Sequence, residues 1–285
     1  MTDSGTRRRP LTTVLLCAIS VVIFAGSVFP VYWMINTSFQ PNNEVRGSEL
    51  HFWPDNFTLR NYETVLLEPG RAPFLPVFGN SLIVTLATVV IALLVAFMAA
   101  VAVTRFRFKS RRTLIIAVIV VQMIPGEAMI VSLYRVLDGW QLSNTLVGLV
   151  LVYVATVLPF TIWTLRGFVN GVPVELEEAA MVDGCTRIGA FRRVTFPLLA
   201  PGLVATGVFA FIQAWNEFLL ALVINASPDM MTLPVWLRTF LNATGTTNWA
   251  AIMAGSTLIA IPVIVFFLVV QGRMTQGVVG GAVKG

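Results

Sequence analysis

The sequence predicts an all-α polytopic membrane protein with six transmembrane helices. Hydrophobic residues make up 56% of its 285 residues and charged residues only 12%, and the mean hydropathy is +0.82. That balance is typical of a membrane protein with several spans rather than of a large soluble domain. Six runs approach the roughly twenty apolar residues that a spanning helix needs. They cover residues 11–35, 77–103, 114–133, 142–165, 198–224 and 252–270.

The first run follows three arginines at residues 7–9, so it could also be a secretory or twin-arginine signal. It is longer than the apolar core of a signal peptide, and it continues to Tyr32 and Trp33 without a clear cleavage site. Aromatic residues at that end suit the membrane interface. We therefore predict a cytoplasmic tail at residues 1–10 and a retained transmembrane helix at residues 11–36.

The remaining chain divides into an outer loop at residues 37–76, a core of five spans at residues 77–270 and a tail at residues 271–285. A long polar connection at residues 166–198 separates the fourth and fifth runs of the whole chain. The third run is the least uniform, because Pro125 and Gly126 interrupt it. We expect these two residues to break or kink their helix, as is common where helices line a cavity.

The basic residues predict which side of the membrane each connection faces. Of the 19 Lys and Arg, 14 fall in the two tails and in the connections after the second and fourth runs. The alternate connections hold only Arg46, Arg60, Arg71, Arg135 and Arg238. By the positive-inside rule, both termini and the polar connection at residues 166–198 lie in the cytoplasm. The basic residues form no face on a folded soluble domain, which argues against nucleic-acid binding.

The side chains of catalysis and metal binding are scarce. The two cysteines, Cys17 and Cys185, lie in different segments, and the single histidine, His51, falls in the outer loop. This pattern suggests no disulfide framework, no metal site and no Ser–His–Asp arrangement. The glycine spacing of a nucleotide-phosphate loop is also absent, so we expect no nucleotide hydrolysis by that route in this chain. The mildly acidic outer loop could contact an external protein or be a linker.

The polar connection predicts a helix, a glycine turn and a second helix. Pro173 stands where a helix begins, and acidic residues follow in the expected first turn, where they meet free N–H groups. Gly184 offers the left-handed conformation that ends a helix, and Thr186 is a plausible cap for a second short helix that Pro197 breaks. On physical grounds alone, an interfacial linker without a partner stays open. The acidic residues are Glu175, Glu177 and Glu178.

Within this connection, the pattern Glu178-Ala179-Ala180-x-x-Asp183-Gly184, followed by Phe191, Pro197 and Pro201, resembles the EAA motif of ABC importer permeases. The chain is similar to the inner permeases of the carbohydrate-uptake type, such as the second permease of maltose transporters. The likeness extends over about residues 10–285. Supporting segments are Asn144-Thr145, Leu158-Pro159-Phe160, Trp163-x-x-Arg166-Gly167-Phe168, Trp215-Asn216-Glu217-Phe218 and the closing Gly281-Ala282-Val283-Lys284-Gly285.

The resemblance implies the fold of type I ABC importer permeases (MetI-like) and a cytoplasmic coupling loop at residues 166–198. It implies a second homologous permease, two ATP-binding cassette subunits that hold ATP and Mg, an extracytoplasmic solute-binding protein and a bacterial cell membrane as the location. This chain itself would hold no cofactor. The residues implied to contact the ATPase are Glu178, Ala179, Ala180, Asp183, Gly184, Phe191 and Pro197.

The resemblance favours import of a di- or oligosaccharide or a polyol. A permease of the same architecture for another solute, such as a glycerophosphate or a polyamine, is an alternative, and an intramembrane enzyme is a remote one. Polar groups inside the spans are costly in lipid, so they face either the transport pathway or another helix. Both interpretations stay open for Gln122, Glu127, Trp215, Asn216 and Glu217, where the Trp215 ring and its polar neighbours would suit a sugar.

Overall fold

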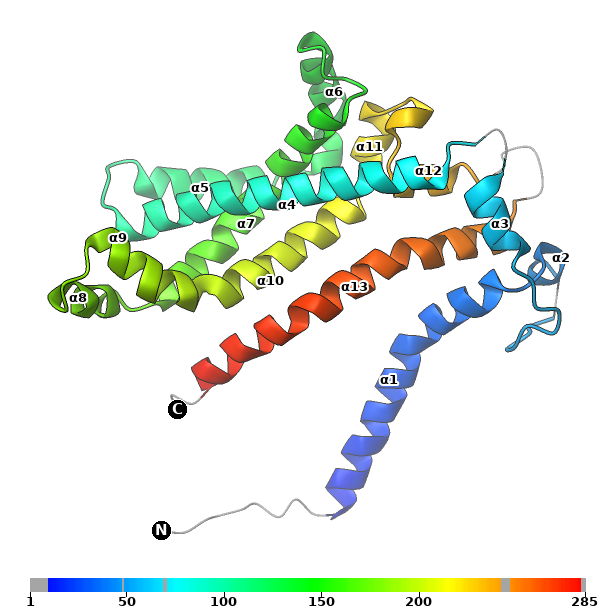
Figure 1. The fold of residues 1–285 in the computed structure, drawn as a ribbon, viewed down its shortest axis with the longest axis horizontal. Coiled ribbons are helices and arrows are strands. Elements are labelled where there is room, and N and C mark those ends of the chain that lie inside the picture. The colour runs from blue at the N-terminus through cyan, green and yellow to red at the C-terminus, as the bar shows by residue number, and fades with distance from the viewer. Residues whose placement is uncertain (1–9, 48, 69–70, 242–246, 283–285) are drawn as a thin grey trace. The chain divides into compact units, whose positions relative to one another are not determined.

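The computed structural model describes residues 10–47, 49–68, 71–241 and 247–282, and these residues are helical apart from their connections (Figure 1). Residues 1–9 of the predicted amino-terminal tail, and residues 283–285 of the closing segment, lie outside this description. The chain divides into two compact units. One holds the residues up to 68 together with residues 240–260, and the other holds residues 69–239 and 261–285.

The first unit is built on one long apolar helix and a short polar loop region. Its elements are α1 (Pro10–Ser38), α2 (Asn42–Val45), α3 (Arg60–Leu67) and the start of α13 (Trp249–Ala282). The apolar window of α1 has no buried residues within the structure. At the carboxyl end of α1, the buried Asn61 amide donates to the carbonyls of Ser38 and Gln40, both at 2.8 Å. These bonds hold α3 against the end of α1.

The second unit contains the other long helices and the segments that join them. Its elements, besides the later part of α13, are α4 (Phe74–Arg105), α5 (Arg111–Gln122), η1 (Gly126–Met129), α6 (Ile130–Gly139), α7 (Leu146–Gly171), α8 (Glu175–Val182), α9 (Arg187–Ala190), η2 (Phe191–Thr195), α10 (Phe196–Trp215), α11 (Leu219–Ile224), η3 (Pro228–Met230) and α12 (Leu233–Arg238).

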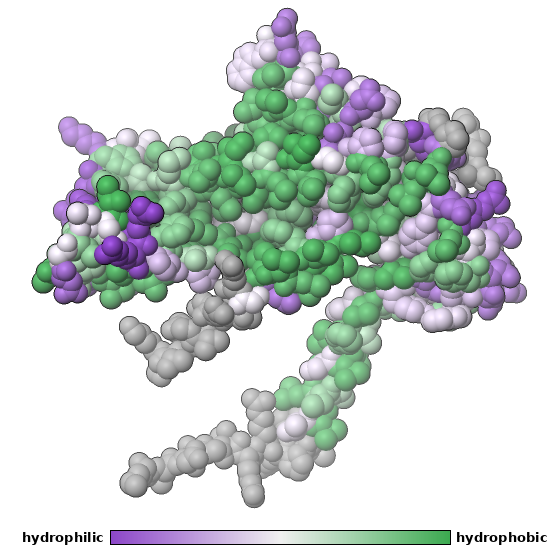
Figure 2. Space-filling model, viewed as in Figure 1, coloured by the Kyte–Doolittle hydropathy of each residue, from purple (hydrophilic) through white to green (hydrophobic). Residues whose placement is uncertain are grey.

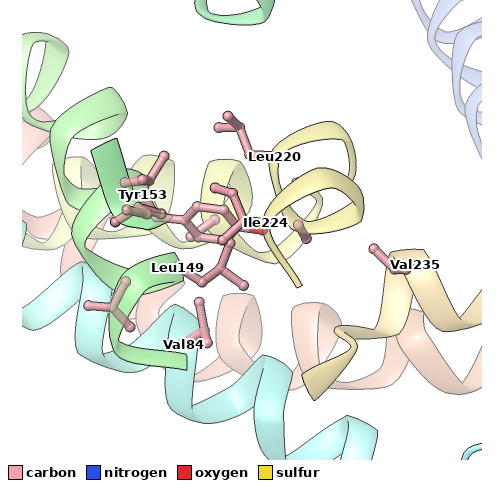
Figure 3. Close-up of a cluster of buried hydrophobic side chains, with 11 residues drawn as sticks. Val84, Leu149, Tyr153, Leu220, Ile224 and Val235 are labelled. Atoms are coloured by element: carbon pink, nitrogen blue, oxygen red, sulfur yellow. The ribbon is translucent and has the colours of Figure 1, made fainter. Parts of the chain in front are cut away.

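Small residues let α4 pack closely against α7 and α10. Ala96 and Ala100 of α4 are fully buried beside Leu165 of α7 and Leu199 of α10. Close approach through alanine is a common way for helices to associate in a membrane, where contact between apolar side chains alone gives little preference over lipid. A second buried cluster joins α4, α7 and α11, and Figure 3 shows Tyr153 of α7 in it beside α11.

The structure agrees with the predicted spans except in the fifth run. Among the described residues, five helices are long and apolar enough to cross a membrane, and six spans result if α5 and the segment η1–α6 are counted as one. These two pieces meet at 89°. The break follows Gln122 and contains Pro125, which confirms the prediction that the third run is interrupted.

The fifth predicted run, residues 198–224, is not one helix. The helix α10 ends at Trp215, and α11 begins at Leu219 after a short break. The prediction that Pro197 ends a second short helix was also wrong, because the apolar span runs without interruption from Arg187 to Trp215. A π-helical turn, η2, precedes the proline. In that turn the Phe196 N–H reaches back to the Phe191 carbonyl, which widens the helix where Pro197 has no N–H to donate.

Candidate functional site

The predicted helix–glycine–helix element is present, and a side chain caps the start of its second helix. We call residues Glu175–Ala190 the α8–α9 hairpin. At the start of α9, the Gly189 N–H donates to Thr186 Oγ1 at 3.1 Å, which confirms Thr186 as a cap. At the start of α8, negative side chains meet the positive end of the helix dipole. They are the three predicted acids Glu175, Glu177 and Glu178.

Gly184 makes the turn between the two helices. Its φ is +90°, a left-handed conformation that only glycine adopts without strain. The Gly184 N–H donates to the Met181 carbonyl at 3.1 Å, and the Cys185 N–H donates to the Ala180 carbonyl at 3.0 Å. This pair of bonds is the Schellman motif, which satisfies carbonyls left free at a helix end. The prediction of a left-handed glycine that ends α8 is confirmed.

The outer face of the hairpin carries large apolar side chains without cover. Val182 is 88% exposed and Ile188 is 73% exposed, one on each side of the Gly184 turn. Figure 2 shows strongly hydrophilic residues gathered around this end of the second unit, in contrast to the apolar surface along the long helices. An apolar patch with a polar rim is typical of a protein interaction surface. The predicted contact residues exposed beside it are Glu178, Ala179, Asp183 and Gly184.

The inner face of the hairpin is held by a buried ion pair. Arg105 Nη2, at the end of α4, lies 3.3 Å from Glu177 Oε1, and Thr195 Oγ1 in η2 donates to the same oxygen at 2.8 Å. Arg105 also donates to the carbonyl of Val172, just after α7, at 2.9 Å. The α8 helix is thereby tied to the ends of three long helices. Sequence reasoning missed this network, because it treated Arg105 only as a topology signal and Glu177 only as a first-turn acid.

The remaining three predicted contact residues are Ala180, Phe191 and Pro197. The Phe191 ring packs against Phe97 of α4, with ring centroids 6.0 Å apart, and is half-buried. Ala180 is also half-buried, whereas Pro197 is exposed in the first turn of α10. Phe191 therefore fixes the hairpin to α4, and the residues around Gly184 are the ones free to meet another molecule.

A second group of polar residues forms hydrogen bonds with the two helix ends on either side of the break between α10 and α11. The Asn216 amide donates to the Ile212 carbonyl at 2.8 Å, at the end of α10. The Glu217 carboxylate accepts from the N–H groups of Leu220 and Ala221 at 2.8 and 3.0 Å, at the start of α11. A helix that is interrupted at membrane depth needs such partners, because lipid offers none. Sequence reasoning had weighed only pathway and helix–helix roles for both residues.

The candidate pathway residues lie in different surroundings. Glu127 and Glu217 line one cavity of about 210 Å³ with Gln213, and the Tyr153 O–H donates to Glu217 Oε2 at 2.7 Å. Gln122 instead lines a different, apolar cavity beside Trp163 and Phe160. Within the part of the chain that the structure describes, no three His, Cys, Asp or Glu side chains could share a metal ion.

Trp215 is only 1% exposed, so no face of its ring is open to a solute in this structure. The ring stacks on Phe211, with centroids 5.6 Å apart, and meets Phe78 of α4 edge-on at 6.3 Å. These contacts make Trp215 part of the core at the point where α10 ends. The sequence cannot separate this position from an exposed one, because a tryptophan at the end of an apolar run suits both.

Replacing Glu217 by alanine is expected to destabilise the protein by about 1–3 kcal/mol, because it leaves the two N–H groups of α11 without an acceptor. The measurement is the unfolding midpoint of the purified protein in detergent. Tyr153→Phe removes only one of the bonds to Glu217, so a smaller loss, about 1 kcal/mol, is expected.

Glu127→Ala is the matched control for Glu217→Ala, since Glu127 is an exposed carboxylate on the same cavity. Its unfolding midpoint should stay that of the unmodified protein. A Glu217→Ala protein of unchanged stability would show that the capping bonds contribute little. Loss of transport in that stable protein would then favour a pathway role.

Comparison with known proteins identifies relatives over nearly the whole chain. Residues 89–279 match the family described as binding-protein-dependent transport system inner membrane component. The diacetylchitobiose uptake system permease protein DasC of Streptomyces coelicolor is 46% identical over 266 residues, which cover 93% of this chain and 95% of that one. The trehalose transport system permease protein SugB of Mycobacterium tuberculosis is 36% identical, with 99% and 100% covered.

A solved structure has the same fold. It is a bacterial ABC transporter involved in the import of the acidic polysaccharide alginate, and a chain of it superposes with a TM-score of 0.77. The match covers 95% of this chain and 99% of that chain at 19% sequence identity. Identity this low supports the fold alone.

Proposed function

This chain belongs to the family of binding-protein-dependent transport system inner membrane components, and from that premise we propose that it imports a sugar. It is a multi-pass membrane permease and not an enzyme. As a permease of an ABC importer, it works with an ATPase and a substrate-binding protein.

The solute class follows from the relatives. The 46% identical relative is named for diacetylchitobiose and the 36% identical one for trehalose, and both are disaccharides. A further relative, from Halalkalibacterium halodurans, is 34% identical and is named for arabinooligosaccharides. A di- or oligosaccharide is therefore the favoured solute. Glu127 and Glu217 stay the leading pathway candidates because they face one cavity, with Gln122, Trp215 and Asn216 as weaker ones.

The proposed assembly contains a second homologous permease, which forms the other half of the pathway, and two ATP-binding cassette subunits. ATP and Mg bind to those subunits and not to this chain. Both termini and the α8–α9 hairpin face the cytoplasm of a bacterium, in line with the distribution of Lys and Arg along the sequence. The membrane is the inner or plasma membrane.

The observation that carries the coupling role is the α8–α9 hairpin. It presents Val182 and Ile188 to the cytoplasm while Glu177 ties it to the long helices. A partner that holds this face can move it as a rigid lever, because the ion pair and the packing of Phe191 leave the hairpin little freedom of its own. Such rigid-body motion suits a transporter that alternates between two open states. The exposed contact residues are then Glu178, Ala179, Asp183 and Gly184.

The test is uptake by the reconstituted transporter together with a ligand screen on its binding protein. Thermal shift of the binding protein identifies the solute, and proteoliposomes that contain the permeases and the ATPase then report ATP-dependent accumulation of that solute. We expect a disaccharide to give both signals. Stabilisation of the binding protein by a glycerophosphate or a polyamine, with no response to sugars, would contradict the proposed solute class and keep the permease role.

A further inference from the structure

The first unit exposes a group of large apolar side chains in the connection between α2 and α3, and no part of the proposed mechanism uses them. Leu50 is 72% exposed, Phe52 61% and Trp53 74%. Single exposed apolar residues are ordinary, but neighbours of this size form a patch of the kind that meets another protein or a membrane. We call residues 50–53 the loop tip. Its position relative to α1 distinguishes the two kinds of partner.

Hydrogen bonds and a ring contact fold the loop tip back along α1, as Figure 1 shows for the connection between α2 and α3. The Tyr32 O–H donates to the Phe52 carbonyl, and the Asn36 amide donates to the His51 carbonyl at 2.9 Å. The Phe52 ring also meets the Trp33 ring edge-on, with centroids 5.8 Å apart. Tyr32 lies roughly 9 Å before the end of α1 at the usual helical rise. The chain therefore leaves the helix and returns to the level of Tyr32 and Trp33.

Tyr32 and Trp33 mark the edge of the membrane on α1. The apolar run ends at Ile35, and residues 36–38 are polar and buried within the first unit. A helix of residues 11–35 is about 37 Å long, whereas the hydrocarbon core of a bilayer is about 30 Å thick. The helix is therefore long enough to reach the headgroup region, where Tyr and Trp are enriched. The loop tip lies at that same depth.

Charges on both sides limit how deeply the loop tip enters. Glu49 precedes it and Asp55 follows it, and both are exposed. His51 Nδ1 lies 2.6 Å from Asp55 Oδ2, so the one titratable side chain of the tip faces a flanking carboxylate. A carboxylate is costly in hydrocarbon, whereas an apolar ring beside it is favoured in the headgroup region. The pattern therefore fits the membrane interface and not the hydrocarbon core.

We propose that the loop tip is a membrane anchor, in which Leu50, Phe52 and Trp53 insert into the headgroup region of the bilayer beside the end of α1. The hydrogen bonds from Tyr32 and Asn36 favour lipid over an external protein, because they hold the tip at the depth of the bilayer rather than beyond the helix. Insertion depends only on α1 crossing a membrane. That the leaflet is the outer one rests on the proposed function.

The test places a spin label at the loop tip of the complete permease–ATPase complex in liposomes. Trp53→Cys and Leu50→Cys carry the label one at a time, with the two native cysteines, Cys17 and Cys185, replaced by alanine. Oxygen concentrates in lipid and a nickel chelate stays in water, so collisions with each report the surroundings of the label. We expect the ratio of oxygen to chelate collisions at both positions to be severalfold higher than for a label in water. Retained uptake shows that each labelled complex is folded.

Phe57→Cys is the matched control. Phe57 is 63% exposed, close to the value for Phe52, but its ring stacks on Phe39, past the end of α1, with centroids 4.9 Å apart. It is therefore equally apolar and lies beyond the level of Tyr32. A label there should collide mainly with the chelate, as should a label at the exposed Glu63 on α3.

Two results would overturn the anchor. Labels at the loop tip that meet the chelate as often as the label at Phe57→Cys would place the tip in water. Labels at the tip that are shielded from both reagents would show that a protein covers it, either the second permease or the ATPase.

The orientation is tested separately, with a membrane-impermeant thiol reagent on intact spheroplasts. Phe57→Cys should react, because the loop after α1 is external in the proposed function. A reaction that occurs only after lysis, together with tip labels that meet oxygen, would overturn the proposed orientation and keep the anchor.

Discussion

Gly184→Asp is expected to leave the protein in the membrane and to reduce sugar uptake by about tenfold or more. Gly184 has a φ of +90°, a region where most side chains cost roughly 1–2 kcal/mol; aspartate tolerates it better than most but also adds a carboxylate to the exposed turn. The turn would relax away from this conformation and carry α9 and the apolar face around Val182 with it. A loss of about 1.4 kcal/mol in the free energy of the contact with the ATPase is enough for a tenfold change. Proteoliposomes report uptake and ATP hydrolysis together, and we expect hydrolysis to persist without transport.

A substitution series separates backbone strain from direct contact. A Cβ at Gly184 would meet nothing within 4 Å, so any loss caused within this chain comes from the backbone conformation and not from a clash. Asparagine tolerates the left-handed region better than valine, so Gly184→Asn should keep more transport than Gly184→Val. Gly171→Ala is the control, since Gly171 also has open space around it and has no positive φ. Normal uptake by Gly184→Asp would contradict the docking role of the hairpin.

The parts of this fold that could be predicted are those that depend on neighbouring residues. The spans other than the fifth follow from apolar runs, and the Gly184 turn and the Thr186 cap follow from local backbone chemistry, so the structure confirms them. The break at Pro125 belongs to the same class, because proline acts on its own helix.

The parts that could not be predicted depend on distant residues or on compensation. The sequence predicts Glu217 to be an acidic residue within a transmembrane span. It gives no signal that the Glu217 carboxylate caps a helix that begins at Leu219. Pro197 predicts the end of a helix, but a π-helical turn just before it lets the helix continue through the proline. Arg105 and Glu177 lie far apart in the chain, so their contact exists only in the folded protein.

The buried ion pair predicts the second large effect. Glu177→Ala should destabilise the protein by about 3–5 kcal/mol, the usual cost of leaving one charge of a buried pair without its partner. The side chains of Arg105 and Glu177 are 9% and 12% exposed, so water cannot readily replace the lost carboxylate. The yield of folded protein after detergent extraction and its unfolding midpoint measure this loss. Replacing both residues by methionine should restore part of the stability, because no buried charge is then left alone.

Glu178→Ala is the matched control for Glu177→Ala. We expect it to impair transport without loss of stability, whereas Glu177→Ala should lower stability. Glu178 is adjacent in sequence but exposed on the outer face of α8, so its loss should leave the unfolding midpoint unchanged and reduce ATP-driven uptake. Glu177→Ala should lower the unfolding midpoint. The protein that still folds should bind the ATPase, because the outer face of α8 is unchanged. Two neighbouring glutamates would then separate the two tasks of α8, which are attachment to the long helices and contact with the partner. Equal stability losses in the two variants would contradict this division.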